Sequence, residues 1–473
     1  MIKPEMQEIL NLLNGSLQIE DGQPLVKDAA RLREDIHHLA EVSALESGPR
    51  QGYARYLTLL AAQASGIYLA SINDLYMARG RGEVPSNFTV PAINLRALTF
   101  EAAKAVFRAA IAVDAGALIF EIARSEMGYT DQRPGEYVTS VLAAAIAEGF
   151  SGPVFVQGDH FQVSGKRYAS DPQTELQAVR DLIQEAIAAG FYNIDIDTST
   201  LVDLSQPTIP QQQALNTGLS AMYTAYIREL EPDGVTISVG GEIGEVGGQN
   251  STEEELRAYM DGYNAELAKL GSDLVGISKI SIQTGTSHGG VVLPDGSIAD
   301  VSVDFGALLR LSRVARDEYG MAGAVQHGAS TLPESAFGKF VESQACEVHL
   351  ATNFQNMLFD RLPVDLKGQM YAYLDEKNAG DRKAGMTGEQ FYYKTRKNAI
   401  GPFKRQLWQM PEEKRAEIGE AWEEQFKKLF SYLAISDTRR YVEQTIQPLV
   451  VKPSLKAYLG ESAGEEDVSD LAD

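Results

Sequence analysis

The chain has 473 residues, 44% of them hydrophobic, and a formal net charge of −23. This charge argues against nucleic acid and anionic membrane as partners, because both would be repelled. The single cysteine, Cys346, excludes an intramolecular disulfide framework and fits a reducing compartment. The N-terminal residues do not form a secretory signal, and no run of about 18 apolar residues occurs, so we expect a cytoplasmic protein without a membrane span.

Residues 1–85 are expected to form a helical extension without strands. From residue 88 onward, short apolar and β-branched runs alternate with segments of helical periodicity. The predicted strands are 88–93, 117–122, 153–157, 192–197, 235–240, 276–282, 322–326 and 346–350. Each βα unit needs about 30 residues, which the spacing provides. Eight such units predict a closed (β/α)8 barrel, the TIM barrel, over residues 86–365.

Two of the intervening helices carry clear start and stop signals. Asp171 is expected to cap the first, and Gly190 to end it. Ser251 and Glu254 match a capping box for the second, which Gly271 is expected to end.

The strand pattern disappears after residue 365. Charged helices are predicted over 366–458, and the acidic tail 459–473 is expected to be disordered. The helices contain a basic cluster, made of Lys394, Arg396, Lys397, Lys404 and Arg405. We expect a solvated helix face there; the alternative is that an arginine of this cluster meets a substrate phosphate. The added helices are expected to build an oligomer interface.

Four of the six histidines lie at or just after predicted strands: His160, His288, His327 and His349. A parallel barrel brings its strand ends to one face, where three imidazoles could hold a metal ion. Asp159 precedes His160 and could orient that ligand or transfer a proton; the alternative is a buried, structural Asp–His pair.

Small residues follow two of these histidines. Gly289 comes after His288, and Gly328 and Ser330 come after His327. Turns built of such residues expose backbone amides that can bind an anion.

Acidic residues end two further strands. Glu242 is expected to point into the barrel mouth. Asp195 and Asp197 share one strand face because side chains alternate along a strand. For Asp195 we favour hydrogen bonding inside the barrel.

These segments resemble the class II, metal-dependent ketose-bisphosphate aldolases, of which fructose-bisphosphate aldolase is the main member. The resemblance runs in order over residues 86–360, through VPAINLRALT, GPVFVQGDHF, NIDIDTS, VGGEIGEVGG, GTSHG and HGAS. It implies Zn²⁺ as the cofactor, with another divalent metal as an alternative and a monovalent cation as an addition.

Carried over by position, the resemblance makes His160, His288 and His327 the zinc ligands, with Glu242 as an auxiliary ligand. Zinc would act as a Lewis acid on the ketose carbonyl. Asp159 would be the catalytic residue that moves the proton of the hydroxyl that becomes the aldehyde.

The remaining matches concern the substrate and the surroundings of the metal. Asp197 matches an acid near an alternative metal position. The implied substrate and phosphate contacts are Asn94, Gly289, Gly328, Ser330, His349 and Thr352.

The resemblance therefore implies reversible cleavage of a ketose 1,6-bisphosphate, first of all fructose 1,6-bisphosphate, to dihydroxyacetone phosphate and glyceraldehyde 3-phosphate. It also implies a phosphorylated sugar as partner and a homo-oligomer, dimer or tetramer. His349 and Ala351 stand where the family has Asn and Asp, so tagatose bisphosphate or another phosphorylated ketose stays open. A non-catalytic stabilising subunit of such an aldolase is the alternative of a different class.

The general base is left unassigned. The family offers an acid after the Gly-Gly of its mobile loop, whereas Gln249 and Asn250 follow here. Glu253 and Glu254 come next, and both suit the first turn of a helix.

Overall fold

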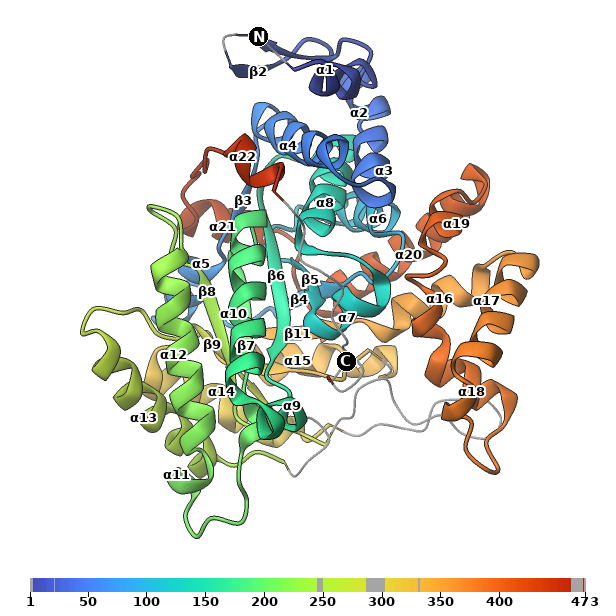
Figure 1. Ribbon diagram of the computed structural model, residues 1–473. Helices are drawn as coiled ribbons and strands as arrows, with labels where there is room; N and C mark the ends of the chain where they lie inside the picture. The colour runs from blue at the N-terminus through green and yellow to red at the C-terminus, as the bar shows by residue number, and fades with distance from the viewer. Residues whose placement is uncertain are drawn as a thin grey trace.

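The computed structural model describes residues 3–20, 22–244, 250–285, 303–330, 332–460 and 471. Its centre is a barrel of eight parallel strands with helices outside it, as predicted (Figure 1). The barrel strands are β4 (Val90–Asn94), β5 (Ile119–Ala123), β6 (Gly152–Gln162), β7 (Asn193–Asp197), β8 (Ser238–Glu242), β9 (Lys279–Ile282), β10 (Ala324–Gln326) and β11 (Glu347–Leu350). Each strand pairs with the next, and β11 pairs with β4, which closes the barrel.

Helices follow the barrel strands and cover them from outside. They are α6 (Thr99–Ala112), α7 (Arg124–Thr130), α8 (Pro134–Glu148), α9 (Gly165–Ser170), α10 (Pro172–Ala189), α11 (Ile209–Gln212), α12 (Ala214–Leu230), α13 (Glu253–Leu270), α14 (Phe305–Tyr319), α15 (Gly338–Glu342) and α16 (Thr352–Arg361), with short 3₁₀ turns at Ser199–Leu201 and Glu334–Ala336. The predicted limits of α10 are confirmed. The Asp171 side chain accepts a hydrogen bond from the Thr174 amide, and Gly190 ends the helix with φ 105°.

The predicted start of α13 is wrong by one residue. The capping box is formed by Thr252 and Glu255 instead of Ser251 and Glu254. Both pairs satisfy the same sequence pattern, so the pattern alone could not separate them. Ser251 is held elsewhere: its hydroxyl accepts from the Gln283 amide at 3.0 Å, and its own amide donates to the Gln283 carbonyl at 2.8 Å.

The N-terminal extension contains helices, as predicted, but the expectation that it lacks strands is wrong. Its elements are α1 (Pro4–Asn11), β1 (Leu17–Glu20), β2 (Gln23–Val26), α2 (Ala29–Asp35), α3 (His37–Leu45), α4 (Pro49–Ala64), β3 (Ile67–Ala70) and α5 (Asn73–Gly80). β1 and β2 form an antiparallel hairpin whose turn includes Gly22 with φ 77°, and β3 pairs in parallel with the start of β6. Four residues are too few to display the alternation that predicts a strand.

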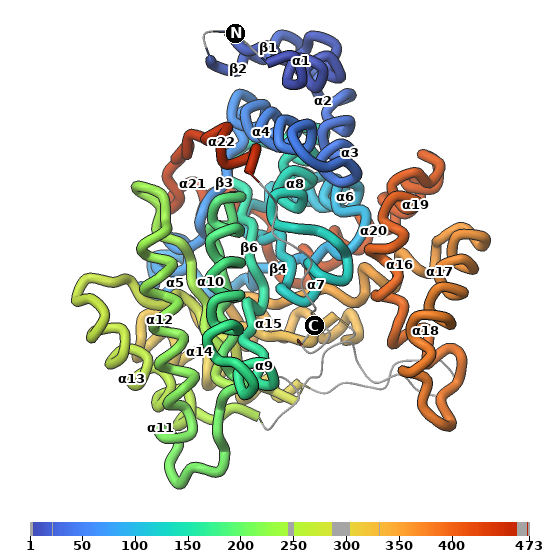
Figure 2. Tube along the Cα trace, in the orientation of Figure 1, coloured from blue at the N-terminus to red at the C-terminus, as the bar shows by residue number. Residues whose placement is uncertain are grey.

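The C-terminal extension is helical. Its elements are α17 (Val364–Lys377), α18 (Gly388–Thr395), α19 (Lys404–Trp408), α20 (Glu412–Tyr432), α21 (Arg439–Thr445) and α22 (Leu455–Tyr458), with 3₁₀ turns at Ala379–Asp381 and Arg396–Ala399. α20 packs on α6 and α16, and Nε1 of Trp422 donates to the Phe354 carbonyl at 3.1 Å. α21 packs on α5 and α22 on α4, so the two extensions meet at one end of the molecule (Figure 2).

Nearly all of the acidic tail predicted over 459–473 lies outside the described residues, so its disorder stays a prediction. Among the helices that the structure describes, none is long and apolar enough to cross a membrane.

The basic cluster forms the predicted solvated face only in part, because Lys394 and Arg405 are exposed whereas Arg396 and Lys404 are not. Arg396 is buried, donates to the Asn356 side-chain oxygen and lies 4.3 Å from the centre of the Tyr393 ring. Lys404 forms an ion pair with Glu136 at 2.8 Å. These cations face inward because the 3₁₀ turn and α19 pack against α7 and α3.

A layer of charged side chains lies inside the barrel. Nζ of Lys279 is 2.9 Å from Oδ2 of Asp195, 2.5 Å from Oε1 of Glu347 and 2.7 Å from Oε1 of Gln157. Tyr76, from α5, donates to the other carboxylate oxygen of Glu347. The predicted interior role of Asp195 is thereby confirmed. Burial alone would lower the pKa of Lys279 and raise that of Glu347, but their contact reverses both shifts.

Lys279→Met removes this cation and keeps an apolar side chain of similar length. We expect the free energy of unfolding to fall by about 3–5 kcal/mol near pH 7, because the variant leaves buried carboxylates without a counter-charge. In the variant, burial raises the pKa of Glu347 above its ordinary value of 4.5. A carboxyl whose pKa is raised by folding loses its stabilising contribution as the pH rises, so the deficit should grow from pH 4.5 to pH 8.

Urea unfolding at both pH values measures this deficit. Lys269→Met, which removes an exposed lysine of α13, is the control and should change stability by less than about 0.5 kcal/mol. A Lys279→Met deficit that does not vary with pH would contradict the account.

Candidate metal centre

Four side chains predicted as ligands or neighbouring acids meet at the carboxyl ends of the strands. His160 lies near the end of β6, Asp197 ends β7, Glu242 ends β8, and His327 directly follows β10. All four are at most 3% exposed. The barrel closure therefore brings together residues that are far apart in sequence, as predicted.

A bulge in β6 directs His160. The pairing of β6 with β7 shifts register between Gly158 and Phe161, and His160 has φ 39°, a left-handed conformation. Such a conformation costs a non-glycine residue about 1–3 kcal/mol and concentrates at functional sites. A Cβ atom at Gly158 would lie 2.4 Å from the Phe161 ring, so only glycine fits beside the bulge.

His160, Glu242 and His327 form a compact donor set. Nε2 of His160 is 3.0 Å from Nδ1 of His327, and Nδ1 of His160 is 3.2 Å from Oε2 of Glu242. Two nitrogen ligands of one tetrahedral zinc ion lie about 3.3 Å apart. One ligand atom from each of the three residues lies within 4.8 Å of the others. Two imidazoles and a carboxylate at this spacing fit a divalent metal ion.

The charges around this set favour a cation. Burial would lower the pKa of His160, but Asp159 and Glu242 raise it well above its ordinary value. Burial and the neighbouring Asp197 raise the pKa of Glu242 to about 7. The carboxylates thus repel one another and stabilise positive charge between them.

Asp197 anchors the His160 ring. Its carboxylate lies 3.2 Å from Nδ1 of His160 and accepts from Nε2 of Gln162 and from the Ser199 hydroxyl, both at 2.6 Å. Burial would raise the pKa of Asp197, but these bonds keep it below its ordinary value. An ionised acid behind a ligand imidazole orients the ring and strengthens its donor nitrogen.

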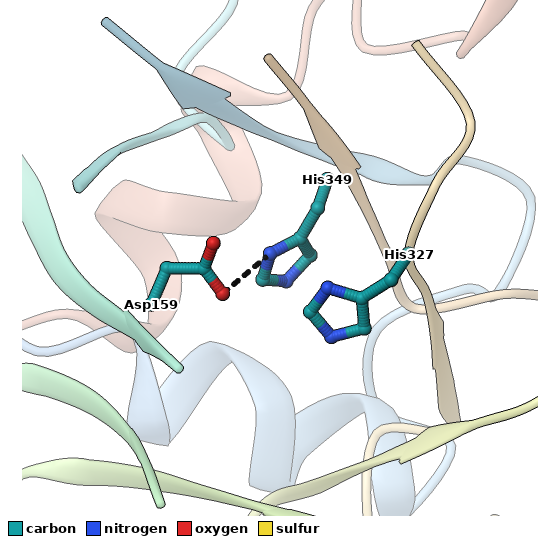
Figure 3. Close-up of side chains that lie close together, drawn as sticks. All are labelled: Asp159, His327 and His349. Carbon is teal, nitrogen blue, oxygen red and sulfur yellow. Dashed lines mark ion pairs between the residues drawn. The ribbon is translucent and has the colours of Figure 1, made fainter. Parts of the chain in front are cut away.

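Asp159 and His349 face each other beside this donor set (Figure 3). Oδ1 of Asp159 is 3.2 Å from Nδ1 of His349 and 3.8 Å from Nε2 of His160. Nε2 of His349 bonds to Oε1 of Glu347 at 2.7 Å, and Nδ1 is also 3.0 Å from Oε2 of Glu121. Burial would lower the pKa of His349, but Glu121 and Asp159 raise it well above its ordinary value.

Three of the residues predicted to hold phosphate lie at the ends of β10 and β11. Gly328 has φ 67° in the turn after His327. The Ser330 hydroxyl accepts from the Ala351 amide at 2.6 Å, and Thr352 begins α16. Their roles toward a phosphate stay predictions.

Asn94 lies at the mouth, next to Glu126 and Arg96, two charged residues that were not predicted to belong to the site. Its Nδ2 donates to Glu126 at 2.6 Å, and Glu126 also pairs with Arg96 at 2.7 Å. Nζ of Lys397 lies 5.1 Å from the centre of the Tyr129 ring. Burial and the charge of Arg96 lower the pKa of Lys397 to about 8.

Several predicted residues lie outside the described part of the chain. They are His288, Gly289 and the loop residues 245–249, which include Gln249. Glu253 and Glu254 occupy the first turn of α13, where acidic side chains stabilise a helix. Glu253 also lies 3.5 Å from Arg257, so a structural role accounts for its presence there.

Glu121, Lys279 and Glu347 were not among the residues predicted to lie at the site. Two signals were available. Glu121 and Lys279 are charged residues within apolar strand segments, and Glu347 shares a strand face with His349 because side chains alternate. A buried charge in a strand is rare unless it is paired.

No curated protein matches the chain. A structure from Sinorhizobium meliloti 1021, described as a probable tagatose 6 phosphate kinase, is 17% identical, with a TM-score of 0.50, over 78% of this chain and 96% of that one. Fructose-bisphosphate aldolase from Campylobacter jejuni is 16% identical, with a TM-score of 0.47, over 79% of this chain and 97% of that one. At this identity the first likeness supports the fold alone.

A family model matches a longer part of the chain than the motifs named above, which end before residue 360. The model of "Fructose-bisphosphate aldolase class-II" matches residues 85–406, from just before the first barrel strand into the C-terminal helices. The match thus includes the strands that carry His160, Glu242 and His327, and it extends past residue 365. The chain belongs to the class II fructose-bisphosphate aldolase family and is an aldolase, a carbon–carbon lyase.

Proposed function

We propose that this aldolase depends on a divalent metal ion, first of all Zn²⁺, and reversibly cleaves fructose 1,6-bisphosphate to dihydroxyacetone phosphate and glyceraldehyde 3-phosphate. The observation that carries the proposal is the convergence of His160, Glu242 and His327, with the Asp159 carboxylate 3.8 Å from His160. A donor set and an acid–base group side by side are what a metal-assisted retro-aldol reaction needs.

His160 and His327 would hold the metal, with His288 as the predicted third imidazole and Glu242 as an auxiliary ligand. When bound, the ion would supply Lewis-acid polarisation of the ketose carbonyl. Asp197 and Ser281 would fix the two rings, because Asp197 contacts Nδ1 of His160 and Ser281 bonds to Nε2 of His327 at 2.9 Å.

Asp159 would move the proton. Its carboxylate accepts the proton of the C4 hydroxyl, whose oxygen becomes the aldehyde oxygen, and the C3–C4 bond breaks with its electron pair passing to the ketone half. In the reverse direction Asp159 returns the proton. Nδ1 of His349 lies 3.2 Å from this carboxylate, so a positively charged His349 would stabilise its ionised form. The group that protonates C3 stays unassigned.

Arg96 and Lys397 would receive the second phosphate. The charge of Asp159 contributes to raising the pKa of Arg96, so the two groups lie within electrostatic reach of each other. Arg396 is less suited because its guanidinium is buried against aromatic rings. An anion would relieve the repulsion between Arg96 and Lys397 that lowers the pKa of Lys397.

Two alternatives remain as outcomes of the tests below. Nε2 of His349 is engaged by Glu347, so this side chain is not available to contact a ketose as the family's Asn would. This supports testing tagatose 1,6-bisphosphate and other phosphorylated ketoses as substrates. A stabilising subunit without activity would have no need of the donor set. The homo-oligomer also stays a prediction.

Chelation should abolish cleavage of fructose 1,6-bisphosphate, and added zinc should restore it, because the ligands themselves remain intact. Coupled detection of triose phosphate measures the rate, with magnesium as the control ion. Cleavage of tagatose 1,6-bisphosphate without cleavage of fructose 1,6-bisphosphate would assign tagatose 1,6-bisphosphate as the substrate. A metal-free, inactive protein would favour the stabilising subunit.

Asp159→Ala should slow turnover by about 100-fold or more, because it removes the acid–base group. The metal content should remain that of the parent, since the variant keeps His160, Glu242 and His327. Turnover and bound zinc are measured on the same sample. Turnover within a few-fold of the parent would remove Asp159 from the proposed mechanism.

Lys397→Met should raise the KM for fructose 1,6-bisphosphate about 10-fold, which corresponds to ~1.4 kcal/mol of lost binding. The KM for a ketose 1-monophosphate should hardly change, because that substrate lacks the second phosphate. Lys394→Met, three residues earlier and exposed, is the matched control. Equal changes in KM for both substrates would point to a structural role of Lys397.

A further inference from the structure

Glu126, in the first turn of α7, joins Asn94, an expected substrate contact, to Arg96, a proposed ligand of the second phosphate. Its side chain is fully buried, and both carboxylate oxygens are in use. Oε2 accepts from Nδ2 of Asn94 at 2.6 Å and from the Ala123 amide at 2.8 Å. Oε1 accepts from Nε of Arg96 at 2.8 Å and lies 2.7 Å from Nη2 of the same guanidinium. The bond to Ala123 is a helix cap, but it accounts for only one of these contacts.

The contact with Glu126 determines which way the Asn94 amide faces. An ionised carboxylate can only accept hydrogen bonds, so the amide nitrogen must face it and Oδ1 must face the other way. Asn94 is 2% exposed, and its Oδ1 has no hydrogen-bond partner among the described residues. A buried amide oxygen without a donor is rare in folded proteins. It fits a ligand that brings a hydroxyl group to this atom.

The same carboxylate determines which edge of the Arg96 guanidinium can meet a ligand. Glu126 occupies the edge formed by Nε and Nη2. Nη1 lies 3.4 Å from Oε1 of Gln355, which is a long contact for a hydrogen bond. A guanidinium has five N–H groups, and two of them on one edge can bind a phosphate in parallel. The edge formed by Nη1 and the second hydrogen of Nη2 is therefore the one that can bind a phosphate.

A second oxygen atom beside this pair has no partner. The hydroxyl oxygen of Tyr129 is buried and has no hydrogen-bond partner among the residues that the structure describes. Burial raises the pKa of Tyr129, Arg96 lowers it and Glu126 raises it, so both charged residues lie within electrostatic reach of the hydroxyl. The hydroxyl stays protonated and can donate to a ligand. The acceptor on Asn94 and the donors on Arg96 and Tyr129 match the hydroxyl and the phosphate of a phosphorylated sugar.

We propose that Glu126 is a positioning residue, which orients Asn94 to accept a hydroxyl of the sugar and Arg96 to bind the second phosphate. This inference rests on the proposed function, which supplies the sugar bisphosphate. Because one carboxylate holds both side chains, neither can turn away without losing a bond to Glu126. Only an acid serves both partners, since a glutamine would turn its NH₂ group toward one of them and could accept from the other alone.

Binding of a hexitol 1,6-bisphosphate tests this role without catalysis, because the reduced sugar cannot be cleaved. Calorimetry on the full chain compares it with a hexitol 1-phosphate, which lacks the second phosphate. Glu126→Gln should weaken binding of the bisphosphate about 10- to 100-fold, as expected for a lost hydrogen bond to a charged group. Binding of the monophosphate should weaken by much less. In an Arg96→Met background, Glu126→Gln should affect both ligands alike, because the phosphate contact is already lost.

Glu136→Gln, in α8, is the matched control. Glu136 is also buried and paired with a cation, Lys404, at 2.8 Å, and the variant should bind both ligands like the parent. If Glu126→Gln does not fold, Glu126→Asp keeps the charge but is too short to hold both partners, and the same selective loss is expected.

Two results would overturn the positioning role of Glu126. One is a Glu126→Gln variant that binds the bisphosphate as tightly as the parent does. The other is equal weakening of both ligands in the variant that retains Arg96, which would indicate a structural role. A parent that does not bind the hexitol bisphosphate would also contradict this inference. A parent that binds it but cleaves no ketose bisphosphate would contradict the proposed function and leave this inference to the variants.

Discussion

The interior of the barrel depends on the contact of Lys279 with Asp195 and Glu347. Without that cation the two carboxylates would be buried like charges, and burial would drive them to take up protons. With it, Glu347 stays ionised and can accept hydrogen bonds from both Tyr76 and His349. His349 in turn lies against Asp159. The ammonium group of Lys279 thus keeps Glu347 ionised, Glu347 binds His349, and His349 lies beside Asp159, the proposed proton carrier.

The N-terminal extension is part of this arrangement. α5 brings Tyr76 to Glu347 and also buries Arg79, which donates to the Phe88 carbonyl at 2.7 Å and to the Ala345 carbonyl at 3.1 Å. Both carbonyls lie just before barrel strands, β4 and β11. The extension therefore closes the amino-terminal end of the barrel with hydrogen bonds that those strands do not supply themselves. It is a component of the barrel core as much as an addition to it.

Much of the fold could be predicted because the signals are local and repeated. Eight apolar runs at regular spacing predicted eight strands, and parallel closure then predicted that His160, Glu242 and His327 would meet. The orientation of side chains could not be predicted in this way. His349 turns toward Glu347 and Asp159 because strands β5, β6 and β11 together contribute the charges around it. The sequence of any one of these strands does not reveal that arrangement.

Other errors have the same origin. Ser251 and Thr252 both fit a capping pattern, and only the pairing of Ser251 with Gln283 after β9 decides between them. The basic cluster has the composition of a solvated helix, but Arg396 is buried because Asn356 and aromatic rings from other helices receive it. Contacts that join distant segments decide these cases, whereas local propensity leaves them open.

Gly158 shows how a residue can govern a site without entering it. It has no side chain to donate to a metal, but the missing side chain leaves the space that the Phe161 ring occupies beside the bulge, and this bulge carries His160. A survey of tolerated substitutions would therefore group Gly158 with the metal ligands. A designer who transplanted the His160 motif into another barrel would have to move Gly158 and Phe161 with it, because the direction of the imidazole is determined by the backbone of the bulge and not by the histidine itself.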